Sequence, residues 1–163
     1  MTDTSVTARS VTHATFVIER TFAHAPARVF AAFASAEQKS RWFGSGASAP
    51  DSDYSLDFRV GGREWSKGMA GADHTYTLES TYYDIVPDER IVAAYEMHLD
   101  GERISVSLAT TELLADGVGT RLTYTEQGAF LDGLDEPAMR EHGTRELFEA
   151  LAAALDDPDR PRA

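Results

Sequence analysis

The sequence of 163 residues contains no cysteine. This absence excludes disulfides, iron–sulfur clusters, thiolate zinc sites and cysteine nucleophiles. Basic residues are also scarce, since 15 Lys and Arg stand against 27 Asp and Glu and give a net charge of −12. Nucleic-acid binding depends on Lys and Arg that contact phosphates, and docking to an anionic membrane depends on basic patches. We therefore expect neither a nucleic acid nor a membrane as a partner.

Sequence signals for membrane insertion, export and catalysis are missing as well. No apolar run approaches the roughly 20 residues that span a bilayer, and the N-terminus lacks the hydrophobic segment of a signal peptide. Neither a G-x-S-x-G motif nor a glycine-rich phosphate loop is present. No two histidines have the i, i+2 or i, i+4 spacing of metal ligands; the five are His13, His24, His74, His98 and His142. We predict a cytoplasmic protein with no catalytic residue, metal ion or cofactor.

The composition is that of a folded domain. Of the residues, 42% are hydrophobic and 26% are charged, close to the average of globular proteins. A chain of this length corresponds to a single domain. Residues 1–13 are rich in Ser and Thr and poor in large apolar side chains, so we expect a flexible lead-in. We place the domain at residues 14–156 and a disordered tail at 157–163.

Alternating apolar and polar residues predict about seven strands. The first covers residues 15–22 and carries Arg20 on its apolar face. Two short helices follow: Pro26 starts one, and Ser35 with Gln38 has the spacing of a capping box for another that extends to Phe43. The remaining strands are expected at residues 56–60, 63–69, 74–86, 90–99, 103–114 and 120–127, with a bulge in the strand at 74–86 and Asp-Gly turns at 100–101 and 116–117.

A long helix is expected from Pro137 to about Leu155, because apolar residues recur there at helical spacing. We expect its small residues to allow a close approach to the sheet; the inward positions are Gly143, Leu147, Ala150, Leu151 and Ala154. The order of elements predicts an α+β fold, in which a curved antiparallel sheet of about seven strands wraps around this helix. Such an arrangement tends to leave a cavity between sheet and helix.

Several segments carry a resemblance to a known family. They are FVIERTF at 16–22, RWFG at 41–44, DFRVGG at 57–62, YDIVPDERIV at 83–92 and GTRLTYT at 119–125. Over residues 15–155 the chain resembles the SRPBCC superfamily, with its START-like, birch-pollen-allergen-like helix-grip fold. The branch is similar to the C-terminal domain of the heat-shock protein 90 ATPase activator. The resemblance implies the helix-grip fold, whereas function varies among carriers of hydrophobic molecules, aromatase/cyclases and co-chaperone domains.

The chain departs from this branch at two positions. The branch usually has Gly-Trp at the start of the last helix, and here Thr144 follows Gly143. The aromatic lid over the cavity entrance, which that Trp provides in the branch, is then either missing here or supplied by Phe130 or Phe148. A polar residue, often His, is usual at the position that Glu126 occupies.

Aromatic residues on the predicted inner face form the candidate ligand site. The expected cavity residues are Trp42, Phe43, Phe58, Trp65, Tyr76, Tyr82, Tyr95, Met97, Tyr124, Glu126, Phe130 and Phe148. The alternative is that these side chains fill an ordinary core. A packed core favours Leu, Ile and Val, and each buried tyrosine needs a hydrogen-bond partner, so the tyrosines favour a pocket.

Arg20 and Glu126 form a candidate buried polar pair, because each lies on the apolar face of its strand. In the fold that the chain resembles, the first and last strands are neighbours, so the two side chains could meet. An unpaired charge on an inner face is too costly to keep. The alternative is that Arg20 extends to the rim and Glu126 sits at a frayed strand end.

Three functions remain open at this point. The first is non-enzymatic binding of a small, mostly hydrophobic ligand in the cavity. The second is an aromatase/cyclase-type enzyme on a polyketide-like substrate, guided by the tyrosines with Arg20 and Glu126. The third, a chaperone-regulating interaction module, is disfavoured because the chain is one domain without the additional N-terminal domain of eukaryotic activators. An edge strand in this fold also permits a strand-to-strand homodimer.

Overall fold

The computed structural model describes residues 8–43, 54–70 and 73–159. Residues 44–53, most of the expected lead-in and the end of the expected tail lie outside the described residues. The elements in chain order are β1 (Val11–Phe22), α1 (Pro26–Ala34), α2 (Ala36–Lys39), β2 (Tyr54–Leu56), β3 (Arg63–Ala70), β4 (His74–Val86), β5 (Arg90–Leu99), β6 (Glu102–Asp116), β7 (Gly119–Leu131) and α3 (Pro137–Asp156).

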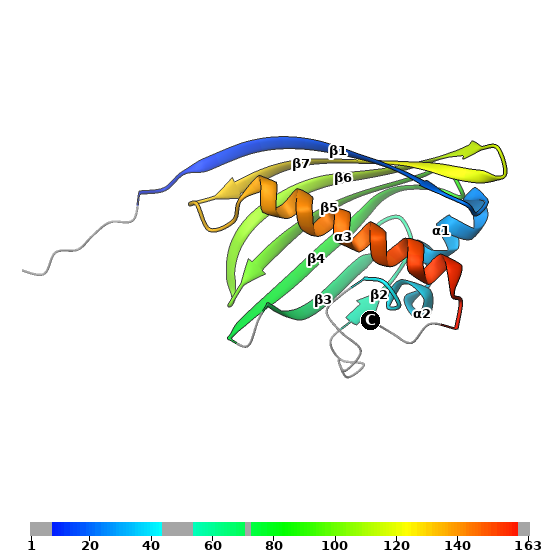
Figure 1. The fold of residues 1–163 in the computed structure, drawn as a ribbon. Coiled ribbons are helices and arrows are strands. Elements are labelled where there is room, and N and C mark those ends of the chain that lie inside the picture. The colour runs from blue at the N-terminus through cyan, green and yellow to red at the C-terminus, as the bar shows by residue number, and fades with distance from the viewer. Residues whose placement is uncertain (1–7, 44–53, 71–72, 160–163) are drawn as a thin grey trace, which may run out of the picture.

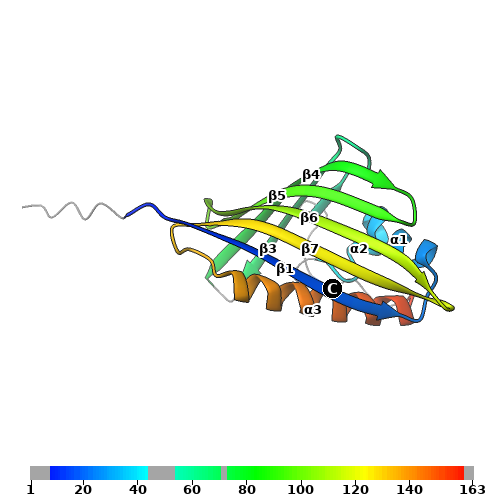
Figure 2. The same cartoon turned by 90° about the horizontal axis from the view of Figure 1, so that it is seen from above.

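One curved sheet of seven strands, in the order β1-β7-β6-β5-β4-β3-β2, forms the body of the molecule. All neighbouring strands are antiparallel. Helix α3 crosses the concave face of the sheet, and α1 and α2 lie at the end of the sheet that the C-terminal half of α3 reaches (Figures 1 and 2). The predicted α+β helix-grip fold is confirmed. Among the described residues, no helix is both long and apolar enough for a transmembrane span.

Tight turns connect consecutive strands into hairpins at the positions that the sequence predicts. Asp100 and Gly101 have φ angles of 50° and 84°, which suits the left-handed conformations of a two-residue hairpin turn. The predicted bulge in β4 is present, because the register with β5 shifts between Tyr82 and Asp84. The sheet edges are β1 and the three-residue β2. Pairing of an edge strand with a second copy of the chain stays a prediction.

The segment 57–62 is a turn, and the predicted strand at 56–60 is wrong. Only Leu56 of that segment belongs to a strand, at the end of β2. Gly61 has a φ of 81°, and a Cβ on Gly62 would lie 2.0 Å from the carbonyl oxygen of Asp57. The two glycines therefore stabilise a tight turn whose backbone bonds to Tyr82 on β4. This turn places Phe58 over the end of the cavity.

Other element boundaries also differ from the prediction. Strand β1 starts at Val11, four residues before the expected start at Thr15, because the backbone at Ser10 is held by Asp132 at the end of β7. Strand β7 correspondingly extends to Leu131, beyond the expected end at 127. Helix α2 has the expected Ser35 cap, but the helix ends at Lys39 and a turn leads on to Phe43.

Helix α3 packs on the sheet through its C-terminal half. Its buried residues are Thr144, Phe148, Leu151, Ala154 and Leu155, and the expected inward residues Leu147 and Ala150 are half-buried. The expected close approach at Gly143 is wrong, since no atom outside the helix backbone lies within 4 Å of a Cβ built there. Gly143 borders open space because the N-terminal half of α3 stands away from the sheet above a cavity.

Candidate functional site

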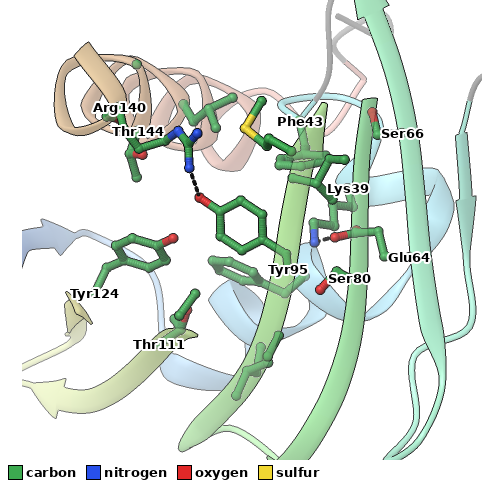
Figure 3. A pocket seen from close by; sticks show the side chains of 18 of the residues that line it. Lys39, Phe43, Glu64, Ser66, Ser80, Tyr95, Thr111, Tyr124, Arg140 and Thr144 are labelled. Atoms are coloured by element: carbon green, nitrogen blue, oxygen red, sulfur yellow. Dashed lines mark hydrogen bonds and ion pairs between the residues drawn. The ribbon is translucent and has the colours of Figure 1, made fainter. Parts of the chain in front are cut away.

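A cavity of about 440 Å³ lies between the concave face of the sheet and helix α3. Strands β3 to β7 supply its floor, α3 its roof, and α1, α2 and Phe58 its end wall. Most of the expected ligand residues line it: Trp42, Phe43, Phe58, Tyr76, Tyr82, Tyr95, Met97, Tyr124 and Phe148. Figure 3 shows Tyr95 projecting into the space between Arg140 of α3 and Lys39 of α2. The aromatic residues therefore surround space and do not fill it.

Three of the expected ligand residues do not line the cavity. Trp65 lies on the opposite face of β3, because the inward positions of this strand are Glu64, Ser66 and Gly68. Phe130 is buried beneath the guanidinium of Arg140, whose Cζ is 5.3 Å from the ring centroid. Glu126 has 0% exposure and lies behind Tyr95 and Tyr124. Of the two aromatics considered as a lid, only Phe148 borders the cavity.

The predicted pair of Arg20 and Glu126 is wrong. Strands β1 and β7 are neighbours as expected, but Arg20 is directly opposite Leu122, and Glu126 is opposite Phe16. A separation of four residues along a strand corresponds to about 13 Å. Arg20 instead pairs with the exposed Glu149 on α3, at the rim of the sheet.

Arg140 on α3 is the cation that neutralises Glu126. One oxygen of Glu126 accepts hydrogen bonds of 2.7 Å from Tyr95 and from Tyr124. Its other oxygen accepts from Ser107 at 3.0 Å and from Arg140 at 3.3 Å. All the accepting positions of this buried carboxylate are thus used, and the four donors hold it in place.

Arg140 connects the helix to the floor of the cavity. Its guanidinium donates to the Tyr95 hydroxyl at 2.9 Å and to Ser105 at 2.7 Å, and it contacts Asp135 at 2.5 Å. Sequence reasoning missed Arg140, although its spacing of three, four and seven residues from Gly143, Thr144 and Leu147 places it on the inward face of the helix.

A second buried ion pair lies at the opposite end of the cavity. Nζ of Lys39 is 2.6 Å from Glu64, and both side chains are nearly buried. The Tyr54 hydroxyl donates to Glu64 at 2.7 Å, and Lys39 donates to the Tyr82 hydroxyl at 3.4 Å. The ammonium also lies 4.7 Å from the ring centroid of Phe43. The sequence analysis missed both charged residues, because Lys39 ends a short polar helix and Glu64 follows a turn.

The buried tyrosines should resist ionisation. Four phenols have raised pKa values, chiefly because they are buried and also because the carboxylates of Glu64 or Glu126 lie nearby. They are Tyr54, Tyr82, Tyr95 and Tyr124. Because the folded state holds these protons more tightly than the unfolded chain, its stability should fall as the pH rises past about 10. Ultraviolet absorbance of phenolate, followed with circular dichroism, should show these four ionising only as the protein unfolds. Full ionisation of all tyrosines in a protein with a native circular dichroism spectrum contradicts this expectation.

A separate group of titratable side chains lies outside the cavity lining. Ligand atoms of Glu79, Glu96 and His98, on β4 and β5, lie within 4.8 Å of one another. The sequence analysis considered only histidines close in sequence and missed this group. Arg103 already pairs with Glu96 at 2.6 Å, and we assign no function to the group.

Comparison with known proteins identifies the family. A family model described as "Activator of Hsp90 ATPase homolog 1-like protein" matches residues 23–156. The chain belongs to this family. The resemblance to the heat-shock protein 90 activator branch is thereby confirmed. No curated protein matches the sequence significantly.

Solved structures of similar proteins share the fold of this member of the Hsp90-activator-homologue family. An uncharacterised protein from Rhizobium leguminosarum has 41% identity and a TM-score of 0.87, with 92% of this chain and 99% of that chain covered. A protein from Rhizobium loti has 51% identity and a TM-score of 0.82, covering 88% and 98%. DynU16, from the dynemicin biosynthetic locus, has 17% identity, a TM-score of 0.62 and coverage of 91% and 49%, so it shows the shared fold alone.

Proposed function

We propose that the protein binds a small, mostly hydrophobic ligand in the cavity under α3, without catalysing a reaction on it. The observation that carries this proposal is the cavity itself. Its volume of about 440 Å³ lies within the range of about 300–1,000 Å³ that is typical of small-molecule sites. Aromatic and aliphatic side chains supply most of its wall, with a few hydroxyl and charged groups among them. This combination is typical of ligand sites.

The polar groups of the cavity support binding over catalysis. An acid or base must reach the substrate, and its proton must be transferable at the working pH. Glu126, which the enzymatic hypothesis requires, is fully buried behind the tyrosines and accepts four hydrogen bonds. The tyrosines have raised pKa values because they are buried, so they keep their protons at neutral pH. The network therefore stabilises the walls of a binding site.

An aromatase/cyclase-type activity is the second candidate. One observation favours it: Glu64 and Lys39, a carboxylate and an ammonium, both line the cavity. Conversion of a polyketide-like chain by the wild type and its loss in Glu64→Gln would support this function over simple binding. Regulation of a chaperone, the activity that the family description names, stays an expectation with no observation at this site to favour it.

Filling the cavity should abolish the binding of an uncharged apolar dye. Ala93 on the floor and Gly143 in the roof both line the cavity, so Ala93→Leu and Gly143→Leu add side-chain volume inside it. Ala138→Leu is the matched control, because this residue is exposed on the same helix. We expect Nile red to become fluorescent with the wild type and the control, and to bind each filled variant at least about tenfold more weakly. Equal binding by all four proteins overturns the proposal.

A further inference from the structure

A diagonal line of small side chains crosses the floor of the cavity. Its members lie on four successive strands and all line the cavity: Ser66 on β3, Ser80 on β4, Ala93 on β5 and Thr111 on β6. On each strand, the member lies two residues away from the position directly opposite the member on the preceding strand. Ser66, for example, is directly opposite Leu78, and the next member, Ser80, lies two residues beyond Leu78. Such diagonal neighbours are about 7–8 Å apart, so this diagonal track runs about 20 Å across the sheet.

The three hydroxyls of the diagonal track have no hydrogen-bond partner among the described residues, although the residues that carry them are almost wholly buried. Ser66, Ser80 and Thr111 are 8%, 7% and 6% exposed. Within the described part of the chain, none of their hydroxyls has a hydrogen-bond partner, and their oxygens are open to the cavity. Because their oxygens face a largely apolar cavity and have no protein partner, these hydroxyls are available to a polar atom that enters the cavity. Each hydroxyl can both donate and accept, and so can serve the oxygen of a ligand.

The charged groups that flank the diagonal track are already neutralised. Lys39 is paired with Glu64 at one end, and Arg140 with Glu126 and Asp135 at the other. Figure 3 shows Arg140 and the Lys39–Glu64 pair on opposite sides of the cavity, with Ser80 and Thr111 on the strands of its floor. A carboxylate or phosphate on the ligand would lose its hydration without finding an unpaired cation. The site therefore favours a ligand without charge.

We propose that the ligand of this cavity is an uncharged, elongated molecule with hydroxyl or carbonyl oxygens spaced along its length, and that the diagonal track recognises those oxygens. This inference rests on the proposed binding function and specifies the chemical class of the ligand. The apolar wall and the aromatic side chains contact the carbon skeleton. The hydroxyls of Ser66, Ser80 and Thr111 supply the polar contacts that fix its direction in the cavity.

A matched pair of competitors tests the role of the oxygens. 4,4′-Dihydroxystilbene and trans-stilbene share a skeleton and differ in their hydroxyls, and each is used to displace Nile red. The variant Ser66→Ala/Ser80→Ala/Thr111→Val removes the polar atoms and keeps the shape of the track. We expect it to bind dihydroxystilbene at least about tenfold more weakly, equivalent to about 1.4 kcal/mol, and stilbene within about twofold of the wild type. Ser55→Ala, an exposed serine on β2, should change neither affinity.

The outcomes separate this inference from the proposed function. Equal weakening of both competitors shows that shape alone matters, and tighter binding of stilbene-4,4′-dicarboxylate than of dihydroxystilbene shows a preference for charge; either overturns the inference. Nile red binding without binding of either stilbene also overturns it but leaves the proposed function in place, whereas failure of Nile red removes both. If the triple variant does not fold, Ser80→Ala alone should give a smaller loss that is again selective for dihydroxystilbene.

Discussion

Glu126→Gln should lower the free energy of unfolding by about 3–5 kcal/mol, the cost of breaking a buried ion pair from one side. Gln keeps an oxygen for the Tyr95 and Tyr124 hydroxyls. Its amide nitrogen, however, cannot accept from Arg140 or Ser107, so two donors lose their acceptor. The guanidinium then keeps Asp135 as its only close carboxylate among the described residues. Chemical denaturation of the variant and the wild type measures the difference.

A matched control and a double-mutant cycle isolate the pair. Glu19→Gln makes the same substitution at an exposed position on β1 and should change stability by less than about 0.5 kcal/mol. Arg140→Met with Glu126→Leu should cost less than the sum of the single variants, because the double variant removes both charges of the pair and leaves only the less buried Asp135 without its cation. A coupling energy indistinguishable from zero would mean that Arg140 does not neutralise Glu126 in solution.

Lys39→Met should destabilise the protein by a similar amount, about 3–5 kcal/mol. The methionine keeps the contact with the aromatic ring of Phe43 but removes the ammonium that lies 2.6 Å from Glu64. The carboxylate of Glu64 then stays buried without a cation, and the neutral Tyr54 hydroxyl still donates to it at 2.7 Å. Thermal and chemical denaturation should both show the loss.

Removal of the second charge should restore stability to the Lys39→Met protein. We expect Lys39→Met with Glu64→Gln to recover a large part of the loss, because no uncompensated charge remains in the cavity wall. Lys67→Met, at an exposed position of β3, controls for the loss of a lysine and should be near neutral. If Lys67→Met and Lys39→Met have equal effects, the pair with Glu64 does not form.

The fold was predictable from the sequence because its signals are local. Asp-Gly turns and alternation of apolar residues fix the hairpins, so β4 to β7 lie where the pattern predicts them, apart from their ends. The turn at 57–62 was missed because Leu56, Phe58 and Val60 alternate as a strand does. What decides this segment is a tertiary contact, the backbone hydrogen bonds of Gly61 and Gly62 to Tyr82 on a distant strand.

The polar part of the site was less predictable, because its partners come from different elements. The inward position of Glu126 follows from strand parity, but which cation reaches it depends on the register of β7 and the position of α3. The prediction that Trp65 lines the cavity was wrong because it assigned the more hydrophobic residue of this strand to the inner face. In the structure the charged Glu64 faces the cavity, and Trp65 lies on the other face of the strand. Glu64 tolerates this position only because Lys39, on another element, neutralises it.

Native mass spectrometry tests the central claim, that the cavity holds a small uncharged ligand, most directly. The wild type and Gly143→Leu are incubated with an organic-solvent extract of cells, separated from unbound material and sprayed under non-denaturing conditions. We predict that each wild-type chain carries one small organic molecule, that accurate mass shows oxygen in it, and that the filled variant carries none. The same adduct on both proteins, or the bare chain mass for both, would contradict the claim.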